Sequence, residues 1–300
     1  MTSKIILIGS IKEYQSKFNL INIEIKKGNL KIVGILPTSK SNLKSIDNIP
    51  LFKSPDELNN INFDYLITLN ENKNLMDIIS EQNLNKKIIP IRVFEIPYFD
   101  FLKYEKLIKN PPSIISAHCW GGLLYHELGL KFTSPFINLF MSDKDFNKLS
   151  KNLHYYMSQD LKYKEEGYEV NLKSKFPIAT LGDLTIYFNH YSTFEEAKQK
   201  WDERKNRINY DNLFFETYTT NLDIAIEFDS LPHKHKLCFC MHNITSEDII
   251  NFSDFMKSLS QKSENLGIVV NSTANGEIPY FNLIDLLLNF NFKPRIKLID

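Results

Sequence analysis

Residues 113–131 read S-I-I-S-A-H-C-W-G-G-L-L-Y-H-E-L-G-L-K, and this stretch predicts the local fold around the strongest chemical candidate in the chain. An apolar run from Ile114 to Ala117 is followed by Cys119, two glycines and an amphipathic segment that ends at Gly129. Such a pattern predicts a strand, a tight turn and a helix. Cys119 then lies at the helix N-terminus, where unpaired N–H groups and the helix dipole favour a thiolate, a phosphate or a carboxylate.

The composition of the chain argues against several classes of protein. The 300 residues contain 36 lysines and arginines and 36 aspartates and glutamates, so no net field attracts nucleic acid or an anionic membrane surface. No apolar run approaches the roughly 18 residues of a membrane-spanning helix, and the run before Gly9 is too short for a signal peptide. Three cysteines, with Cys238 and Cys240 in one apolar run, fit a reducing compartment. We expect a cytoplasmic protein without membrane insertion.

The chain is predicted to form two α/β domains, 1–110 and 111–300. In the first, apolar runs alternate with polar segments, which predicts a Rossmann-like parallel sheet. Ser54-Pro-Asp-Glu57 predicts a helix start with a capping box, and Pro111-Pro112 marks the end of the domain. The predicted strands of this domain cover residues 4–8, 31–36, 64–69 and 87–91.

A dinucleotide is not expected in the first domain. Of the three glycines that a pyrophosphate loop needs, only Gly9 is present, and Ile11 and Tyr14 occupy the other two positions. A side chain at Ile11 would obstruct the close approach of a pyrophosphate. The second predicted strand also ends without an acidic residue for a ribose hydroxyl. We therefore disfavour NAD as a cofactor.

The second domain is predicted to be a separate, mainly parallel α/β domain. Helix starts are signalled at Ser142, Thr193 and Thr245, each a hydroxyl N-cap followed three residues later by an acidic residue. Ligands bind outside the carboxyl ends of parallel strands, so the polar residues at the predicted strand ends should converge in one crevice. The predicted strands cover residues 114–117, 137–141, 184–188, 213–217, 236–241 and 267–270, and further amphipathic helices cover 252–259 and 280–290.

A base that serves Cys119 has to come from a distant strand end. His126 lies roughly 10 Å further along the predicted helix, and His118 points to the opposite face of the strand. His190 and His242, each at a predicted strand end, are the two candidates, and the sequence leaves both open. A cysteine beside a histidine and amide donors is typical of acyl or thioester transfer. The alternative is that Cys119 is a small packing residue.

Further residues are predicted to bind the ligand. Asn189 precedes His190 and is the candidate orienting group. Arg204 falls on the otherwise apolar stripe of a predicted helix, and Arg207 lies one turn further on, so the pair could clamp a phosphate or carboxylate. The alternative is that the Arg204 side chain extends out to solvent or pairs with an internal Asp or Glu. The other candidates directly follow Cys119 in the sequence: Trp120, Gly121 and Gly122.

A metal site is not predicted. Cys238, Cys240 and His242 share one face of a predicted strand, and these residue types can bind zinc. Three consecutive positions on one face lie along a line, however, and not around a tetrahedron. The opposite face is apolar as well, which is typical of a strand that is buried on both sides.

Two stretches carry a family resemblance. The motif H-C-W-G-G-L-L-Y-H-E-L-G-L-K-F-T-S-P-F-I-N-L-F, residues 118–140, and the motif F-N-H-Y-S-T-F-E-E-A-K-Q-K-W-D-E-R-K-N-R-I-N-Y-D-N, residues 188–212, resemble the bacterial family labelled exopolysaccharide biosynthesis protein. The resemblance covers most of the chain from Ser113 onward. The first hundred residues resemble the small Rossmann-like domains attached to sugar-modifying and surface-polysaccharide enzymes, through K-I-V-G-I-L-P, I-P-L-F-K-S-P-D-E-L and F-D-Y-L-I-T-L.

The resemblance implies a role in making surface polysaccharide. The second domain is also similar to a capsule acetyltransferase family in which a strand-end cysteine and a histidine act beside bound coenzyme A. That family has Gly-Asn-Cys-Gln where this chain has Ala117-His-Cys-Trp120, so only Cys119 matches.

The leading expectation is a transferase that moves an acyl or other group to a sugar precursor, with coenzyme A or a nucleotide sugar as cosubstrate. The alternative is a non-catalytic binding or scaffold protein that recognises a phosphorylated sugar or a partner enzyme. In both cases the expected ligand is a small sugar or phosphate-containing molecule. The sequence names neither the donor nor the acceptor, and it leaves the oligomeric state open.

Overall fold

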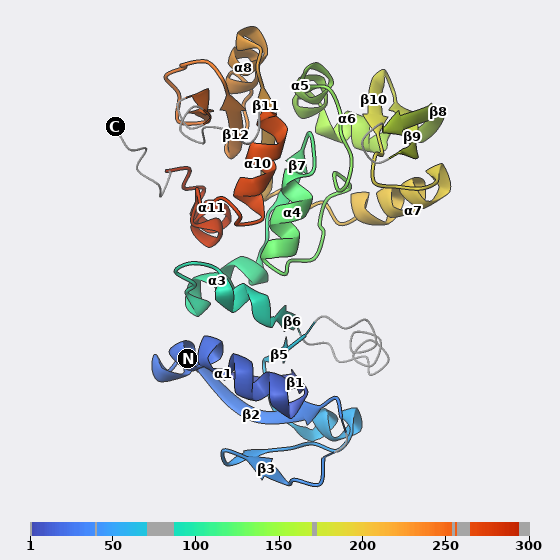
Figure 1. The fold of residues 1–300 in the computed structure, drawn as a ribbon. Helices are drawn as coiled ribbons and strands as arrows, with labels where there is room; N and C mark the ends of the chain where they lie inside the picture. The colour runs from blue at the N-terminus through green and yellow to red at the C-terminus, as the bar shows by residue number, and fades with distance from the viewer. Residues whose placement is uncertain are drawn as a thin grey trace. The chain divides into compact units, whose positions relative to one another are not determined.

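The structure is a computed structural model that describes residues 2–39, 41–70, 87–169, 173–253, 256 and 265–293. The chain divides into two compact units, Met1–Glu105 and Lys106–Asp300, each with interleaved helices and strands (Figure 1). The domain boundary predicted from the sequence, between residues 110 and 111, lies close to the division between the two units. Among the described residues, no helix is long and apolar enough to cross a membrane.

The first unit is built on a four-stranded parallel sheet. The strand order is β2-β1-β5-β6, and helix α1 connects β1 to β2. All four predicted strands are confirmed, because each is a compact apolar run whose central residues are buried. The elements are β1 (Ser3–Gly9), α1 (Ile11–Lys26), β2 (Leu30–Pro37), β3 (Ser45–Ile46), β4 (Ile49–Pro50), β5 (Tyr65–Thr68) and β6 (Lys87–Pro90), with short 3-10 helices at Pro55–Asn60 and Ile91–Glu95. The division between the two units falls within the next helix, α3 (Phe101–Lys109).

The capping box of this unit forms at a different helix from the predicted one. At α1 the Ser10 side chain accepts from the Glu13 N–H, and the Glu13 carboxylate accepts from the Ser10 N–H at 2.7 Å. At Ser54 the chain does turn into a helix, but it is a 3-10 helix and the Ser54 side chain makes no capping bond. The Glu57 carboxylate instead accepts from the Lys53 N–H.

The second unit combines a parallel and an antiparallel sheet. The parallel sheet has the order β13-β12-β11-β7, and the antiparallel sheet has the order β10-β9-β8. The strands are β7 (Ser113–Ser116), β8 (Leu161–Glu169), β9 (Ser174–Leu181), β10 (Leu184–Tyr187), β11 (Leu213–Thr219), β12 (Lys236–Cys240) and β13 (Ile249–Asn251). The helices are α4 (Trp120–Glu127), α5 (Asp143–Lys151), α6 (Leu153–Ser158), α7 (Phe194–Lys205), α8 (Leu222–Asp229), α10 (Leu266–Ala274) and α11 (Leu283–Asn289).

Three sequence predictions for this unit are wrong. Residues 267–270 belong to helix α10, which begins at the N-cap Asn265, so the β-branched run was misread as a strand. Thr245 begins no helix, and the following residues form the edge strand β13. Residues 137–141 form no strand beyond one bridge between Phe140 and Tyr187. The helix predicted over 252–259 lies largely outside the described residues.

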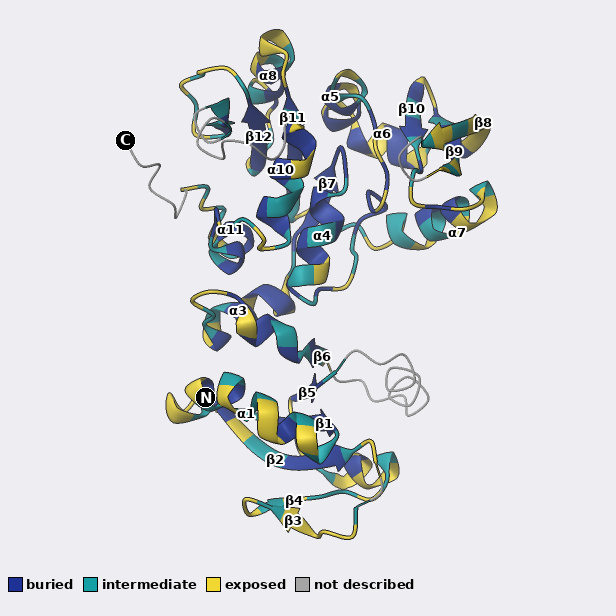
Figure 2. Ribbon diagram, in the orientation of Figure 1, coloured by how far each residue is buried: buried dark blue, intermediate teal, exposed yellow. Residues whose placement is uncertain are grey.

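The segment that contains Phe140 joins the two sheets of the second unit. Phe140 and Tyr187 exchange two backbone hydrogen bonds of 2.8 Å, and the N–H of Met141 donates to the Ala117 carbonyl at 2.9 Å. The segment is thus attached to the ends of both β10 and β7. One hydrophobic core contains buried residues from both sheets, including Ile115 and Ile186 (Figure 2). The end of β10 is therefore held near the end of β7.

Candidate functional site

Cys119 is the N-cap residue of α4, and Ala117 and His118 connect it to the end of β7. Its backbone has helical angles, φ −67° and ψ −15°, and its side chain accepts no hydrogen bond from the helix N–H groups. The residue is half-buried. The strand, turn and helix predicted around Cys119 are present, but the thiol is not engaged by the amide donors expected there.

Cys119 lies beside His190. The Cys119 Sγ atom is 3.3 Å from His190 Nε2, which is a hydrogen-bonding distance for sulfur. His190 is in the turn that follows β10, and its side chain is exposed. The bridge between Phe140 and Tyr187 brings this turn to the end of β7. The two side chains therefore come from different sheets, whereas the sequence predicts that both lie at strand ends of one mainly parallel domain.

His242, the other candidate base, has a different partner. Its Nε2 atom lies 2.8 Å from the Thr220 carbonyl oxygen, so the ring donates its proton to the backbone there. Its backbone N–H donates to the Cys240 sulfur. The structure thus pairs Cys119 with His190 and anchors His242 to the loop after β11.

Burial raises the pKa of the Cys119 thiol to about 11. A helix N-terminus would stabilise the thiolate and lower the pKa of the thiol, whereas the pKa of Cys119 is raised. The reason is that the short helix α4 supplies no hydrogen bond to the sulfur, while the surrounding side chains exclude water. Cys119 is a neutral thiol at pH 7, and a base has to take its proton before the sulfur can attack.

We expect the alkylation rate of Cys119 by iodoacetamide to rise about tenfold per pH unit between pH 7 and pH 10, because the thiolate fraction rises by that factor below a pKa of about 11. The rate is measured by peptide mass spectrometry, which separates Cys119 from the buried Cys238 and Cys240. A plateau below pH 8.5 would contradict this prediction and would show that the helix end or His190 stabilises the thiolate.

A cavity of about 220 Å³ lies at the carboxyl ends of β7 and β11. His118, the sequence neighbour of Cys119, lines it together with Tyr218 of β11. Burial raises the pKa of Tyr218, and the negative charge of Glu216 raises it further. The remaining lining residues come from the turn after β7, the segment that begins at Phe140, the start of α5, and the end of β11 with the residue after it: Ala117, Phe140, Met141, Ser142, Asp143, Thr217, Thr219 and Thr220.

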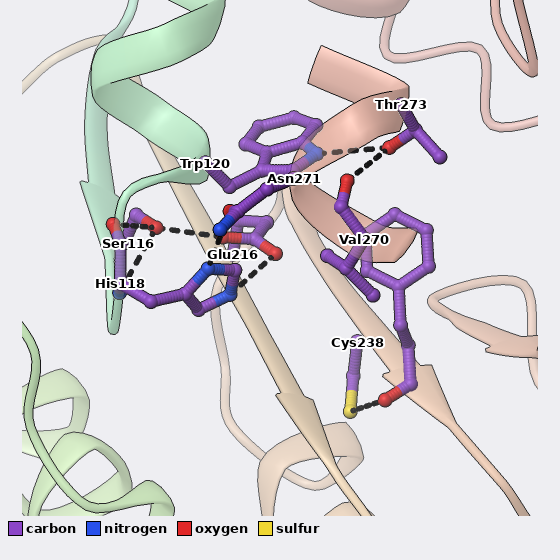
Figure 3. Close-up of polar contacts among 9 residues, drawn as sticks. Ser116, His118, Trp120, Glu216, Cys238, Val270, Asn271 and Thr273 are labelled. Carbon is purple, nitrogen blue, oxygen red and sulfur yellow. Dashed lines mark hydrogen bonds and ion pairs between the residues drawn. The ribbon is translucent and has the colours of Figure 1, made fainter. Parts of the chain in front are cut away.

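A buried polar network supports the turn before Cys119. Ser116 donates to Glu216 at 2.7 Å, and His118 Nδ1 lies 3.1 Å from the Asn271 side-chain oxygen (Figure 3). His118 Nε2 lies 3.1 Å from the other Glu216 oxygen, at an ion-pair distance but without hydrogen-bond alignment. Glu216 is fully buried, and His118 is 5% exposed. The network holds β7, β11 and α10 together behind the cysteine.

The sequence analysis missed this network. The available signal was Glu216 itself, a carboxylate within the apolar strand F-F-E-T-Y, because a fully buried acidic residue needs partners. The contribution of Asn271 could not be found, because the segment around it was read as a strand and not as α10.

Trp120, Gly121 and Gly122, predicted as ligand contacts, are all buried within the second unit. Trp120 is fully buried between aromatic rings, and its indole N–H donates to the Thr273 hydroxyl at 3.1 Å. A Cβ atom at Gly121 would lie 2.9 Å from an Ile114 methyl group, so the glycine allows α4 to lie close to β7. Gly122 is also buried, and a Cβ atom there would make ordinary contacts.

The predicted arginine clamp is not formed. The Arg204 guanidinium donates to the Tyr191 hydroxyl at 2.8 Å and lies 5.1 Å from the centre of the Phe132 ring. Arg207 donates to the Phe132 carbonyl. Arg204 therefore has a partner within the chain, but this partner is a tyrosine hydroxyl and not the Asp or Glu of the alternative. Asn189, the candidate orienting group, has a buried side-chain oxygen without a hydrogen-bond partner among the described residues.

The strand β12 carries Cys238 and Cys240 in the core of the second unit, where both are fully buried. Within the described part of the chain, no group of three or more His, Cys, Asp or Glu side chains is arranged to hold a metal ion. Cys238 and Cys240 contribute to the hydrophobic core that both sheets share.

Two comparisons with known proteins relate this chain to others. The family described as "Domain of unknown function (DUF1919)" matches residues 91–291, which include the whole candidate site. A protein of Haemophilus influenzae described as "Uncharacterized protein" is 37% identical over 139 residues. That match covers 45% of this chain and 64% of the relative, so the chain spans just under two thirds of the relative's length.

Proposed function

This chain belongs to the family described as "Domain of unknown function (DUF1919)", and we propose that it is a cysteine-dependent acyltransferase that acts on a sugar precursor of surface polysaccharide. The observation that carries the proposal is the distance of 3.3 Å between Cys119 Sγ and His190 Nε2 at the end of β7. A thiol within hydrogen-bonding distance of an imidazole is the arrangement that covalent acyl transfer requires. The resemblance to the exopolysaccharide biosynthesis family supports the sugar acceptor.

In the first step, Cys119 attacks the carbonyl carbon of an acyl thioester. His190 takes the thiol proton as the new S–C bond forms, and it then gives this proton to the departing thiol of the donor as the old C–S bond breaks. The raised pKa of Cys119 is consistent with this order of proton transfers. A thiol with a raised pKa stays protonated and unreactive until a donor is bound beside His190.

In the second step, a hydroxyl group of the sugar attacks the acyl-cysteine. Its proton goes to His190, the O–C bond forms, and the S–C bond breaks. His190 then returns the proton to the Cys119 sulfur. The two steps leave the protein unchanged and need no oxidant or metal ion for their balance.

The direct test is to trap the acyl-enzyme. We expect that incubation with acetyl-coenzyme A, without an acceptor, adds one acetyl group to the intact protein and that peptide mapping places it on Cys119. The Cys119→Ala variant should gain none. If the wild-type protein and this variant behave identically over a range of acyl thioesters, the acyltransferase proposal is wrong.

A second candidate function is favoured by the raised pKa of the thiol. A non-catalytic binding protein would also keep Cys119 neutral, since burial alone raises its pKa to about 11. In that case Cys119→Ser would leave ligand affinity unchanged and no acyl-enzyme would form. The trapping experiment separates the two functions, because the binding protein predicts no acetylation at any donor concentration.

A further inference from the structure

We infer that the cavity at the carboxyl ends of β7 and β11 binds one neutral, hydroxyl-bearing ring, and that this ring is the acceptor. The identity of the acceptor rests on the function proposed above, whereas the binding of such a ring rests on the cavity alone. The inference differs from the sequence analysis, which expected a phosphate held by Arg204 and Arg207.

The size of the cavity fits a single ring. Its volume is about 220 Å³. A cavity of about 150 Å³ accommodates benzene, so this one has room for a six-membered ring with small substituents. Larger drug-sized ligands occupy pockets of roughly 300–1,000 Å³, so a complete nucleotide sugar does not fit inside.

The polar groups of the wall fit hydroxyl groups. Ser142, Thr219 and Thr220 are among the lining residues. The Ser142 oxygen accepts from the Asp145 N–H, so its proton can be donated to a ligand, whereas the Thr219 hydroxyl already donates to Asp143. Thr217 is 1% exposed, and its hydroxyl oxygen has no hydrogen-bond partner among the described residues although the residue lines the cavity. A buried hydroxyl without a partner is unfavourable, and a ligand hydroxyl would satisfy it.

The charges of the wall disfavour a phosphate. Asp143 lines the cavity, and Glu216 is buried directly behind His118. None of the described lining residues is a lysine or an arginine. The Asp143 carboxylate in the wall repels an anion, whereas a carboxylate accepts hydrogen bonds from sugar hydroxyls.

The apolar part of the wall fits the faces of a ring. Phe140 is 39% exposed and lines the cavity, and the ring of Tyr218 packs edge-on against His118 with centroids 4.5 Å apart. Mostly apolar and aromatic walls with a few fixed polar groups are typical of small-molecule sites. Ala117 and His118 of this wall directly precede Cys119, so the cavity lies at the strand-to-helix turn that also carries the cysteine.

Saturation-transfer NMR on the Cys119→Ala variant tests the inference without any chemistry at the thiol. The probes are glucose, galactose and N-acetylglucosamine, compared with glucose phosphate as the anionic probe and cyclohexanol as a ring with one hydroxyl. We expect at least one neutral sugar to saturate the protein at concentrations up to about 10 mM, with glucose phosphate and cyclohexanol at least tenfold weaker. The inference is wrong if glucose phosphate is the only probe that binds, or if none of the neutral sugars binds.

Variants locate the binding in the cavity. Thr217→Val keeps the shape of the side chain and removes its hydroxyl, so we expect about tenfold weaker sugar binding, which Thr217→Ser should restore. Thr180→Val on β9, outside the cavity, is the matched control and should bind normally. If Thr217→Val binds as tightly as the parent protein, the ring lies elsewhere and the inference is wrong. Sugar binding without any acyl-enzyme would support this site and refute the proposed acyl transfer, and the reverse result would refute only the site.

Discussion

Cys119→Ala is expected to lower acyl transfer to sugar by about 10⁴-fold or more, because the reaction loses its nucleophile. His190→Asn is expected to lower it by about 10²–10⁴-fold, because the thiol, with a pKa of about 11, loses the base that takes its proton. The combination of both changes should be little worse than Cys119→Ala alone, since the two groups act as one unit. The measurement is single-turnover transfer from acetyl-coenzyme A to the sugar that binds best.

Matched controls separate loss of chemistry from loss of folding. Cys240→Ala removes a buried thiol of the same size, and His154→Asn removes an exposed histidine of α6. Both should keep normal activity for each folded molecule. If Cys119→Ala retains activity within tenfold of the wild type, the cysteine is not the nucleophile. Cys119 accepts no capping bond from α4, so the alanine variant should fold normally.

Glu216→Ala is expected to destabilise the second unit by about 3–5 kcal/mol. The substitution removes one of two acceptors of the Ser116 hydroxyl and the partner of His118 Nε2, and both residues stay buried. Ser116 keeps the His118 carbonyl as an acceptor, and His118 keeps Asn271 at its Nδ1 atom. Each buried polar group without a partner costs about 1–3 kcal/mol, and the space left by the carboxyl side chain adds to this. Urea unfolding followed by tryptophan fluorescence measures the effect, because Trp120 and Trp201 are both buried in this unit.

Two variants calibrate that measurement. Glu216→Gln keeps the shape and an acceptor oxygen, so we expect a loss of about 1–2 kcal/mol. Glu203→Ala removes an exposed carboxylate of α7 and should change the stability by less than about 0.5 kcal/mol. A Glu216→Ala variant as stable as the wild type would show that the network in Figure 3 contributes nothing to the fold.

The sequence predicts the parts of this molecule that are determined locally. The strand around Ile114 and the helix starts at Ser142 and Thr193 were identified correctly, because apolar runs and capping side chains act within a few residues. The misreading of α10 has the opposite cause. Its I-V-V run has strand propensity, and only packing against β11 and α4 makes it a helix.

The candidate site was only partly predictable for a related reason. The sequence reduced the partners of Cys119 to His190 and His242, because both follow apolar runs that end in polar residues. The choice between them depends on the bridge from Phe140 to Tyr187, which is a long-range contact without a local signal. The partner of the Arg204 side chain was also not predictable. Arg204 lies on helix α7, and its partner Tyr191 lies in the turn before this helix.

Cys119 and His190 come from different sheets, so folding of either sheet alone does not bring them together. The two residues are 71 positions apart, and a contact of that sequence separation forms slowly because a long loop has to close first. Each sheet can form its own hairpins or crossovers before this contact exists. A nascent or partly folded chain therefore contains Cys119 without its histidine, and the reactive pair is completed only when the antiparallel sheet docks on the parallel one.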